Sequence, residues 1–231
     1  MDYQKVVEGI FIERPNRFIA RIMLPEGETI AHVKNTGRCK ELLIPGVRVC
    51  LEDHGENTTR KTRYSLISVW KGDMLINMDS QVPNAVAADA LEKGLITQLP
   101  KVDLIKREKT FGDSRFDIYY ESGEQKGFLE VKGVTLEEDG IARFPDAPTI
   151  RGTKHIMELI KAKKEGYEAS ILFLVQMKGP VLFEPNKKMD PEFAEAVQLA
   201  AKKGVQILVY DSVVTPNSIT IGKPINNYAV R

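Results

Sequence analysis

Three charged side chains, Asp117, Glu130 and Lys132, have the types and the spacing that a divalent cation site requires. They lie in two runs of β-forming residues that flank a polar turn at 122–125. A hairpin whose loop is Gly123-Glu124 places Asp117 opposite Glu130. Side chains alternate between the two faces of a strand, so Glu130 and Lys132 share one face. The sequence therefore predicts two carboxylates and one ammonium on one patch of a hairpin.

The chemistry that this patch supports is metal-assisted hydrolysis of a phosphodiester. Asp117 and Glu130 are expected to hold Mg²⁺ or Mn²⁺, because both ions prefer oxygen ligands. A bound ion polarises a phosphoryl oxygen and lowers the pKa of its water. Lys132 would position that water or stabilise the developing charge. A structural cross-strand salt bridge is the alternative, and the apolar residues that flank the charges favour the metal site.

A helix before the hairpin offers a third carboxylate. Asn84 is a suitable N-cap residue, and Ala85–Lys93 is predicted to be a helix that ends at Gly94. Asp89 and Glu92 are three residues apart on one face of that helix. Either of them is a candidate metal ligand, and the spacing does not separate them. An ordinary solvated helix face is the other interpretation.

Residues 83–231 are predicted to form one α/β domain of the mixed type. From residue 84 the expected order is α-β-β-β-α-β-α-β, which puts an antiparallel hairpin in a mixed sheet with helices on both faces. Two prolines predict a loop at 142–149. The later elements are expected to be helices at 151–165 and 191–203 and buried strands at 169–176 and 205–210.

Residues 1–82 predict a small β-barrel. The segments with strand composition are 6–13, 18–24, 29–33, 46–52, 64–70 and 74–78, and turn residues separate them. Short strands at this regular spacing are typical of a barrel, and the segment 32–45 is long enough to add a short helix, as in an OB-type barrel. The junction with the second domain is expected at 81–84.

Basic residues on predicted loops are candidates for contacts with phosphates. In the first domain the candidate DNA-binding residues are Arg17, Lys34, Arg38, Arg60, Lys61 and Arg63. Arg151, Lys154 and His155 lie at a predicted helix N-terminus, which favours anions. Ordinary solvated charges are the alternative for the loops, and a histidine that caps the core is the alternative for His155. Phe18 and Tyr64 are either base-stacking rings or strand core.

Composition limits the possible functions. The net charge of +1 carries no bulk signal for nucleic acid, so such binding requires a local patch. The two cysteines have no metal-ligand spacing and fit reduced thiols in a cytoplasmic protein. The chain shows no apolar signal core, no run of membrane-span length, and neither a GxGxxG motif nor a Walker A loop. We therefore expect a cytoplasmic protein with no membrane partner and no nucleotide cofactor.

The chain resembles the sugar fermentation stimulation protein A family from Arg17-Phe18 to Pro216. The strings that carry the resemblance are HVKNTG at 32–37, LIPG at 43–46, PN at 83–84, SRFD at 114–117, EVK at 130–132, VTL at 134–136, FPDA at 144–147, RG at 151–152, KH at 154–155, VQ at 175–176 and DP at 190–191. The resemblance implies an N-terminal OB-like β-barrel and a C-terminal αβββαβ domain similar to the PD-(D/E)XK nucleases. It also implies DNA binding and a role in regulating sugar (maltose) metabolism genes.

The resemblance assigns Asp117, Glu130 and Lys132 to the nuclease roles, with Phe116 in place of the motif's proline. Asp89 stands where a glutamate is expected in this family. Three hypotheses follow: a Mg²⁺- or Mn²⁺-dependent DNA endonuclease or exonuclease, a DNA-binding regulator with a relic nuclease fold, and an interaction module whose charged patch is structural. RNA is not excluded as a partner.

Overall fold

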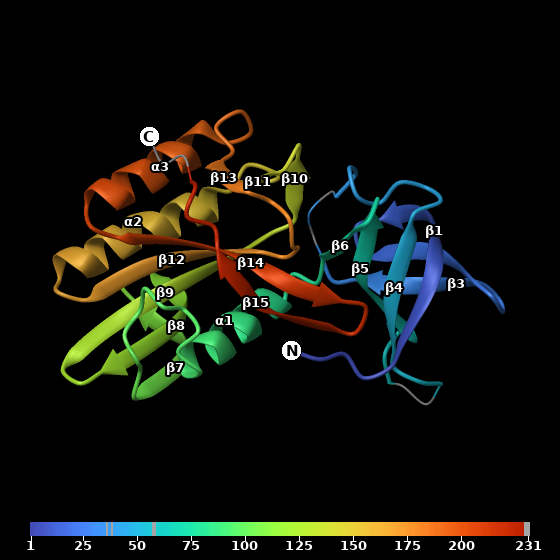
Figure 1. Ribbon diagram of the computed structural model, residues 1–231, viewed down its shortest axis with the longest axis horizontal. Helices are drawn as coiled ribbons and strands as arrows, with labels where there is room; N and C mark the ends of the chain where they lie inside the picture. Colours follow the sequence, from blue (N-terminus) through green and yellow to red (C-terminus); the bar gives the residue numbers. More distant parts are fainter. Residues whose placement is uncertain (36, 38, 57–58, 229–231) are drawn as a thin grey trace.

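Alternating apolar and polar residues form six strands in the first part of the chain. The structure, a computed structural model, describes residues 1–35, 37, 39–56 and 59–228 (Figure 1). The strands are β1 (Val6–Asn16), β2 (Ile19–Leu24), β3 (Gly27–Val33), β4 (Arg48–Asp53), β5 (Tyr64–Lys71) and β6 (Met74–Asn77). Their order is β3-β2-β1-β4-β5-β6, and β3 also pairs with β5. This additional pairing closes five strands into the barrel that the sequence predicts.

The connection between β3 and β4 differs from its prediction. The described residues of 32–45 form turns instead of a helix, and the amides of Leu42 and Leu43 both bond to the Cys39 carbonyl. The Arg14 guanidinium takes the carbonyls of Asn35 and Gly37, at 2.7 and 2.9 Å. A side chain from β1 thus satisfies two backbone carbonyls of this connection.

The second part of the chain is built on a six-stranded mixed sheet. Its elements are α1 (Val82–Glu92), β7 (Leu104–Phe111), β8 (Ser114–Ser122), β9 (Gln125–Val134), β10 (Leu136–Glu138), β11 (Ile141–Phe144), α2 (Ile150–Lys164), β12 (Glu168–Val175), β13 (Leu182–Pro185), α3 (Pro191–Lys202), β14 (Gln206–Thr215) and β15 (Ser218–Pro224). The strand order is β15-β14-β12-β9-β8-β7. β9, β12 and β14 are parallel, and β7, β8 and β9 are antiparallel. The predicted core order αβββαβ is present as α1, β7, β8, β9, α2 and β12.

Helices cover both faces of this sheet, as predicted (Figure 1). Val86 and Leu91 of α1 pack with Leu129 and Val131 of β9. The apolar stripes of α2 and α3 pack on the opposite face, in the cluster that contains Phe128 and Phe173. Both of these helices begin at side-chain caps, because Thr149 accepts from Gly152 and Asp190 accepts from Phe193. The Asp190 carboxylate also accepts from the Thr149 amide at 2.7 Å, which ties the start of α2 to the start of α3.

Two local predictions in this domain are wrong. The segment 142–149 is only partly a loop, because Ile141–Phe144 forms strand β11 in a small sheet with β10 and β13. Pro145 follows the last residue of β11, so it ends the strand and does not prevent it. Asn84 is not the N-cap of α1, because the helix begins earlier, at Val82. The side chain of Asn84 is therefore available for another contact.

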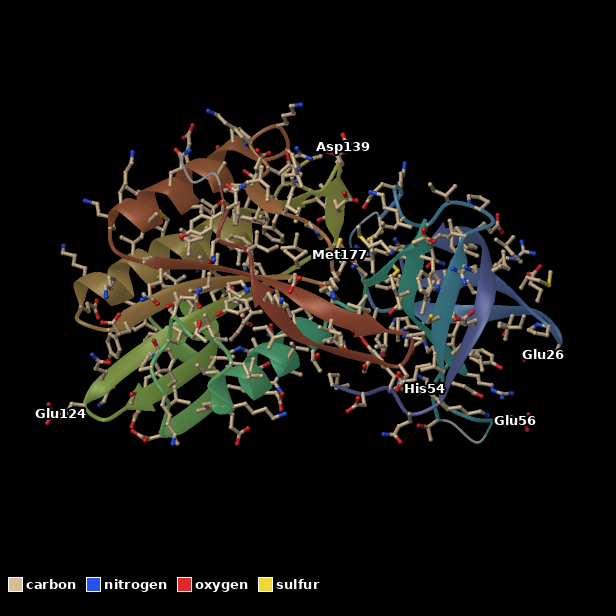
Figure 2. All side chains as sticks on the ribbon, viewed as in Figure 1. Glu26, His54, Glu56, Glu124, Asp139 and Met177 are labelled. Carbon is tan, nitrogen blue, oxygen red and sulfur yellow. The ribbon has the colours of Figure 1, made fainter. Side chains whose placement is uncertain are left out.

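The barrel is attached to the second domain at several places, among them the ion pair between Lys71 of β5 and Glu137 of β10. The link between β6 and α1 carries a buried amide network, in which Gln176 at the end of β12 bonds to Asn77 and Asp79. Separately, Asp2 pairs with Ser218 of β15 and the Tyr3 amide bonds to the Asn217 carbonyl at 2.8 Å. Figure 1 shows the β14–β15 hairpin reaching towards the barrel, and Figure 2 shows Met177 between the two domains. No helix in the described ranges is long and apolar enough to cross a membrane.

Candidate metal and nucleic-acid site

The hairpin of β8 and β9 has the register that its turn predicts. The pairs run from Ser122–Gln125 to Ile118–Leu129, one position short of Asp117 and Glu130. On the other side of β8, the pairing with β7 also omits Asp117, opposite a Glu108 whose φ is 58°. Asp117 therefore lies where β8 departs from regular pairing with both of its neighbours.

The Asp117 carboxylate is held by two donors. Its Oδ2 accepts from the backbone amide of Val131 at 2.8 Å, and its Oδ1 accepts from Asn84 Nδ2 at 2.7 Å. Burial and then the negative charge of Glu130 raise the pKa of Asp117 above its usual value. The register of the hairpin puts Asp117 at the position opposite Glu130 on the neighbouring strand.

Glu130 is 1% exposed, and its two oxygens have different surroundings. Oε1 accepts hydrogen bonds from both Lys132 Nζ and His155 Nδ1. Oε2 is buried and has no hydrogen-bond partner among the residues that the structure describes. Burial raises the pKa of Glu130, but the bonds from His155 and Lys132 outweigh burial and leave the pKa below its usual value. Glu130 is thus an ionised carboxylate with one oxygen unused.

An unused buried carboxylate oxygen beside a second carboxylate fits a hard divalent cation. Such an oxygen is costly without a partner, and a cation would supply one. Within the described residues, no three Asp, Glu, His or Cys side chains gather as a metal-binding group. Mg²⁺ needs only one or two protein carboxylates, because it keeps several water ligands. The donor set of Asp117 and Glu130 meets that requirement.

Asp89 and Glu92, the two predicted helix ligands, are directed elsewhere. Asp89 pairs with Lys93 at 2.8 Å, and both acids line a pocket with Asp103 and Arg107. Asn84 is the α1 side chain that contacts Asp117. At about 100° per residue, position 89 is rotated by about 140° from position 84, which explains its direction. We therefore leave both acids out of the proposed metal site.

Two of the predicted phosphate-binding residues are already held in ion pairs. Lys34 Nζ lies 3.0 Å from Asp79 and 3.5 Å from Glu52, and its side chain is only 12% exposed. Arg63 binds both carboxylate oxygens of Asp53, at 2.7 and 2.9 Å. These residues stabilise the barrel and its linker, and their charges are neutralised by partners in the chain.

The other barrel residues have varied surroundings. The Arg17 guanidinium lies 4.7 Å from the centre of the Phe18 ring, and Phe18 is 45% exposed. Arg60 is exposed and contacts His54 at 3.1 Å, while Lys61 is exposed. Arg38 lies outside the described residues. Tyr64 is buried and belongs to the barrel core, so Phe18 is the better candidate for base stacking.

The start of α2 contributes a contact that the sequence did not predict, between His155 and Glu130. Arg151 and Lys154 are exposed as expected, and Lys154 Nζ bonds to the Asp113 carbonyl at 3.0 Å. His155 is buried against Glu130 and is not available to a phosphate. The four-residue spacing of Arg151 and His155 indicates that both side chains lie on one face of the helix. It does not indicate that this face packs on Glu130.

These features define a class: an OB-like barrel joined to a mixed α/β domain with two carboxylates and a lysine on its central hairpin. Comparisons with known proteins agree. Residues 12–78 match the "SfsA N-terminal OB domain" and residues 81–218 match the "Sugar fermentation stimulation protein RE domain". The chain belongs to the sugar fermentation stimulation protein family.

Relatives match over nearly the whole chain. Proteins described as "Sugar fermentation stimulation protein homolog" from Alkaliphilus oremlandii and Desulfitobacterium hafniense are 58% and 54% identical, each over 96% of both chains. The solved structure of Pyrococcus furiosus SfsA in complex with Ca²⁺ is similar, with a TM-score of 0.87 at 30% identity. That likeness covers 99% of this chain and 97% of the other.

Proposed function

We propose that this protein binds DNA and hydrolyses phosphodiester bonds with Mg²⁺ or Mn²⁺ held by Asp117 and Glu130. The observation that carries the proposal is the buried Glu130 carboxylate, whose Oε1 is bonded twice and whose Oε2 has no partner among the described residues. The similar Pyrococcus furiosus protein forms a complex with Ca²⁺, which supports the proposal because Ca²⁺ also selects oxygen ligands. A bound ion would supply Lewis acidity and a water of lowered pKa.

Lys132 is the proposed catalytic cation. Its Nζ carries three N–H donors, and one of them is used on Glu130 Oε1. The other two are available for a water or for a phosphoryl oxygen close to the carboxylates. Glu130 thus orients Lys132, and Lys132 in turn holds Glu130 in its ionised form.

The proposed DNA path runs from the barrel to the start of α2. Arg17, Lys61, Arg151 and Lys154 are exposed cations, and Phe18 offers a ring for stacking. Arg60 is exposed on the same barrel and is included. A DNA partner is consistent with the cytoplasmic location that the sequence predicts, and the name of the relatives supports a link to sugar metabolism.

The test uses purified protein with linear, nicked and branched DNA, and with an RNA of the same sequence, with and without Mn²⁺. We expect metal-dependent cleavage of at least one DNA substrate by the wild type and none by Glu130→Gln or Lys132→Ala. Asp139→Asn, in the exposed turn between β10 and β11 (Figure 2), is the matched control and should cleave normally. Equal behaviour of wild type and Glu130→Gln on every substrate contradicts the proposal.

A second candidate is a DNA-binding regulator with a relic nuclease fold. The observation that favours it is the contact of Asn84 with Asp117. A carboxylate at the position of Asn84 would strengthen metal binding, whereas the Asn84 amide only donates a hydrogen bond to Asp117. This function predicts salt-sensitive DNA binding in EDTA that survives Asp117→Asn. Binding that requires Mn²⁺ would exclude it.

A further inference from the structure

The first two turns of α2 connect an exposed cation to the buried carboxylate. Arg151 and His155 are four residues apart, so they lie on one face of the helix. Arg151 Nε donates to His155 Nε2 at 3.4 Å, and His155 Nδ1 contacts Glu130 Oε1. The Phe116 ring packs edge-on against the imidazole at 6.3 Å between centres. A continuous line of contacts therefore runs from the surface to Glu130.

The direction of these hydrogen bonds identifies which imidazole nitrogen carries the proton. A guanidinium only donates, so His155 Nε2 accepts from Arg151. The proton of the neutral ring is then on Nδ1, which donates to Glu130 Oε1. Lys132 donates to the same oxygen. Both donors thus converge on Oε1, and Oε2 is left without a partner in the part of the chain that the structure describes.

The outer end of Arg151 completes the arrangement. Arg151 is exposed, and no residue in the described part of the chain bonds to its two terminal nitrogens. A guanidinium whose Nε is held and whose terminal nitrogens are open has the planar donor pair that suits a phosphate. Arg151 also lies at the N-terminal end of α2, where the helix favours anions.

We propose that Arg151 and His155 form a positioning pair, in which Arg151 binds the phosphate nearest the metal and orients His155, and His155 turns Glu130 Oε2 towards the metal. This inference rests on the proposed metal site and assigns to Arg151 a phosphate of the nucleic acid as ligand. It gives His155 a positioning role in place of the DNA contact that its sequence position predicts. Hydrogen bonds of this kind to ligating carboxylates are worth about 10- to 100-fold in metal affinity.

Mn²⁺ titration calorimetry on the full chain without DNA tests the role of His155. We expect His155→Ala to weaken Mn²⁺ binding by about 10- to 100-fold. His155→Asn should retain affinity within a few-fold, because its amide nitrogen can replace Nδ1–H as donor to Oε1. Circular dichroism and melting curves establish that each variant is folded. Wild-type affinity in His155→Ala, or equal losses in Ala and Asn, would overturn the proposal.

A double-mutant cycle tests the pairing of His155 with Arg151. Because the Arg151 side chain is exposed, we expect its variants to fold normally. Arg151→Lys keeps the charge but loses the Nε contact, and should weaken Mn²⁺ binding a few-fold. In the His155→Ala background the same change should have no further effect. Equal effects in both backgrounds would overturn the pair. Absence of Mn²⁺ binding in the wild type is a different outcome, because it removes the proposed metal site itself and the pair's role with it.

Discussion

The Asp117 carboxylate accepts the hydrogen bond of the Val131 amide at the first position where β8 and β9 no longer pair through their backbones. A side chain thus replaces a backbone carbonyl as the partner of an amide in the sheet. The candidate metal ligand is therefore also part of the structure of the hairpin, and substitutions at Asp117 affect binding and stability in separable ways.

Asp117→Asn and Asp117→Ala should differ in their effect on the thermal stability of the metal-free protein. Asn keeps an oxygen for the Val131 amide and removes the charge that opposes Glu130, so its melting temperature in EDTA should equal or exceed that of the wild type. Ala leaves the buried Val131 amide without its partner, at about 1–3 kcal/mol, and removes the acceptor of the half-buried Asn84 amide. Scanning calorimetry measures both. Only the wild type should gain stability from Mn²⁺, and an Asn variant less stable than the Ala variant would contradict this account.

The free energy of unfolding of the barrel should fall at low pH, because Asp53 is then protonated. Hydrogen bonds from Arg63, and then from Lys5, hold the pKa of Asp53 well below its usual range despite burial. The unfolded chain binds this proton at about pH 3.9, so the stabilisation is complete above that pH and is lost as pH falls towards the folded pKa. Asp53→Asn should therefore melt lower at pH 7 and lose less stability between pH 4 and pH 2. Asp73→Asn, exposed in a turn, is the control and should follow the wild-type curve.

Gln176 should contribute to the stability of the whole chain from its buried position between the domains. Its Nε2 donates to the Asn77 carbonyl, to Asn77 Oδ1 and to the Asp79 carbonyl, at 3.0 to 3.1 Å. Gln176→Leu keeps the size of the side chain and removes the donor, which should cost about 1–3 kcal/mol. The melting temperature should fall by about 2–10 °C for a chain of this length. Gln125→Leu, at the exposed start of β9, should change the melting temperature little, and equal effects of the two substitutions would exclude the network as the cause.

The salt dependence of DNA binding should separate exposed cations from paired ones. Lys61→Ala should weaken binding and reduce the slope of log K against log salt by about one. Lys34→Ala should leave the slope unchanged and lower the melting temperature, because it breaks the ion pairs with Asp79 and Glu52. Fluorescence anisotropy across a salt series measures the slopes. A reduced slope in Lys34→Ala would show that its charge is available to DNA.

The periodicity of the chain predicts the barrel strands and the two-sided sheet, because these depend on local patterns of apolar residues, and the polar turn at 122–125 predicts the hairpin register. The proximity of Lys132 to Glu130 follows from the same alternation along one strand. Contacts between distant elements do not follow from it. The bond from Asn84 to Asp117 depends on where α1 begins, and the burial of His155 depends on how α2 packs on β9. Likewise, the ion pairs of Lys34 and Arg63 join separate elements, so loop sequence alone could not distinguish them from exposed cations.

The pairing of Asp2 with Ser218 gives the barrel an attachment besides the β6–α1 link, and the ion pair of Lys71 in β5 with Glu137 in β10 adds another. Attachments from three parts of the chain resist both separation and rotation of the two domains. Nucleic acid bound on the barrel would therefore be held at a fixed distance from the β8–β9 hairpin.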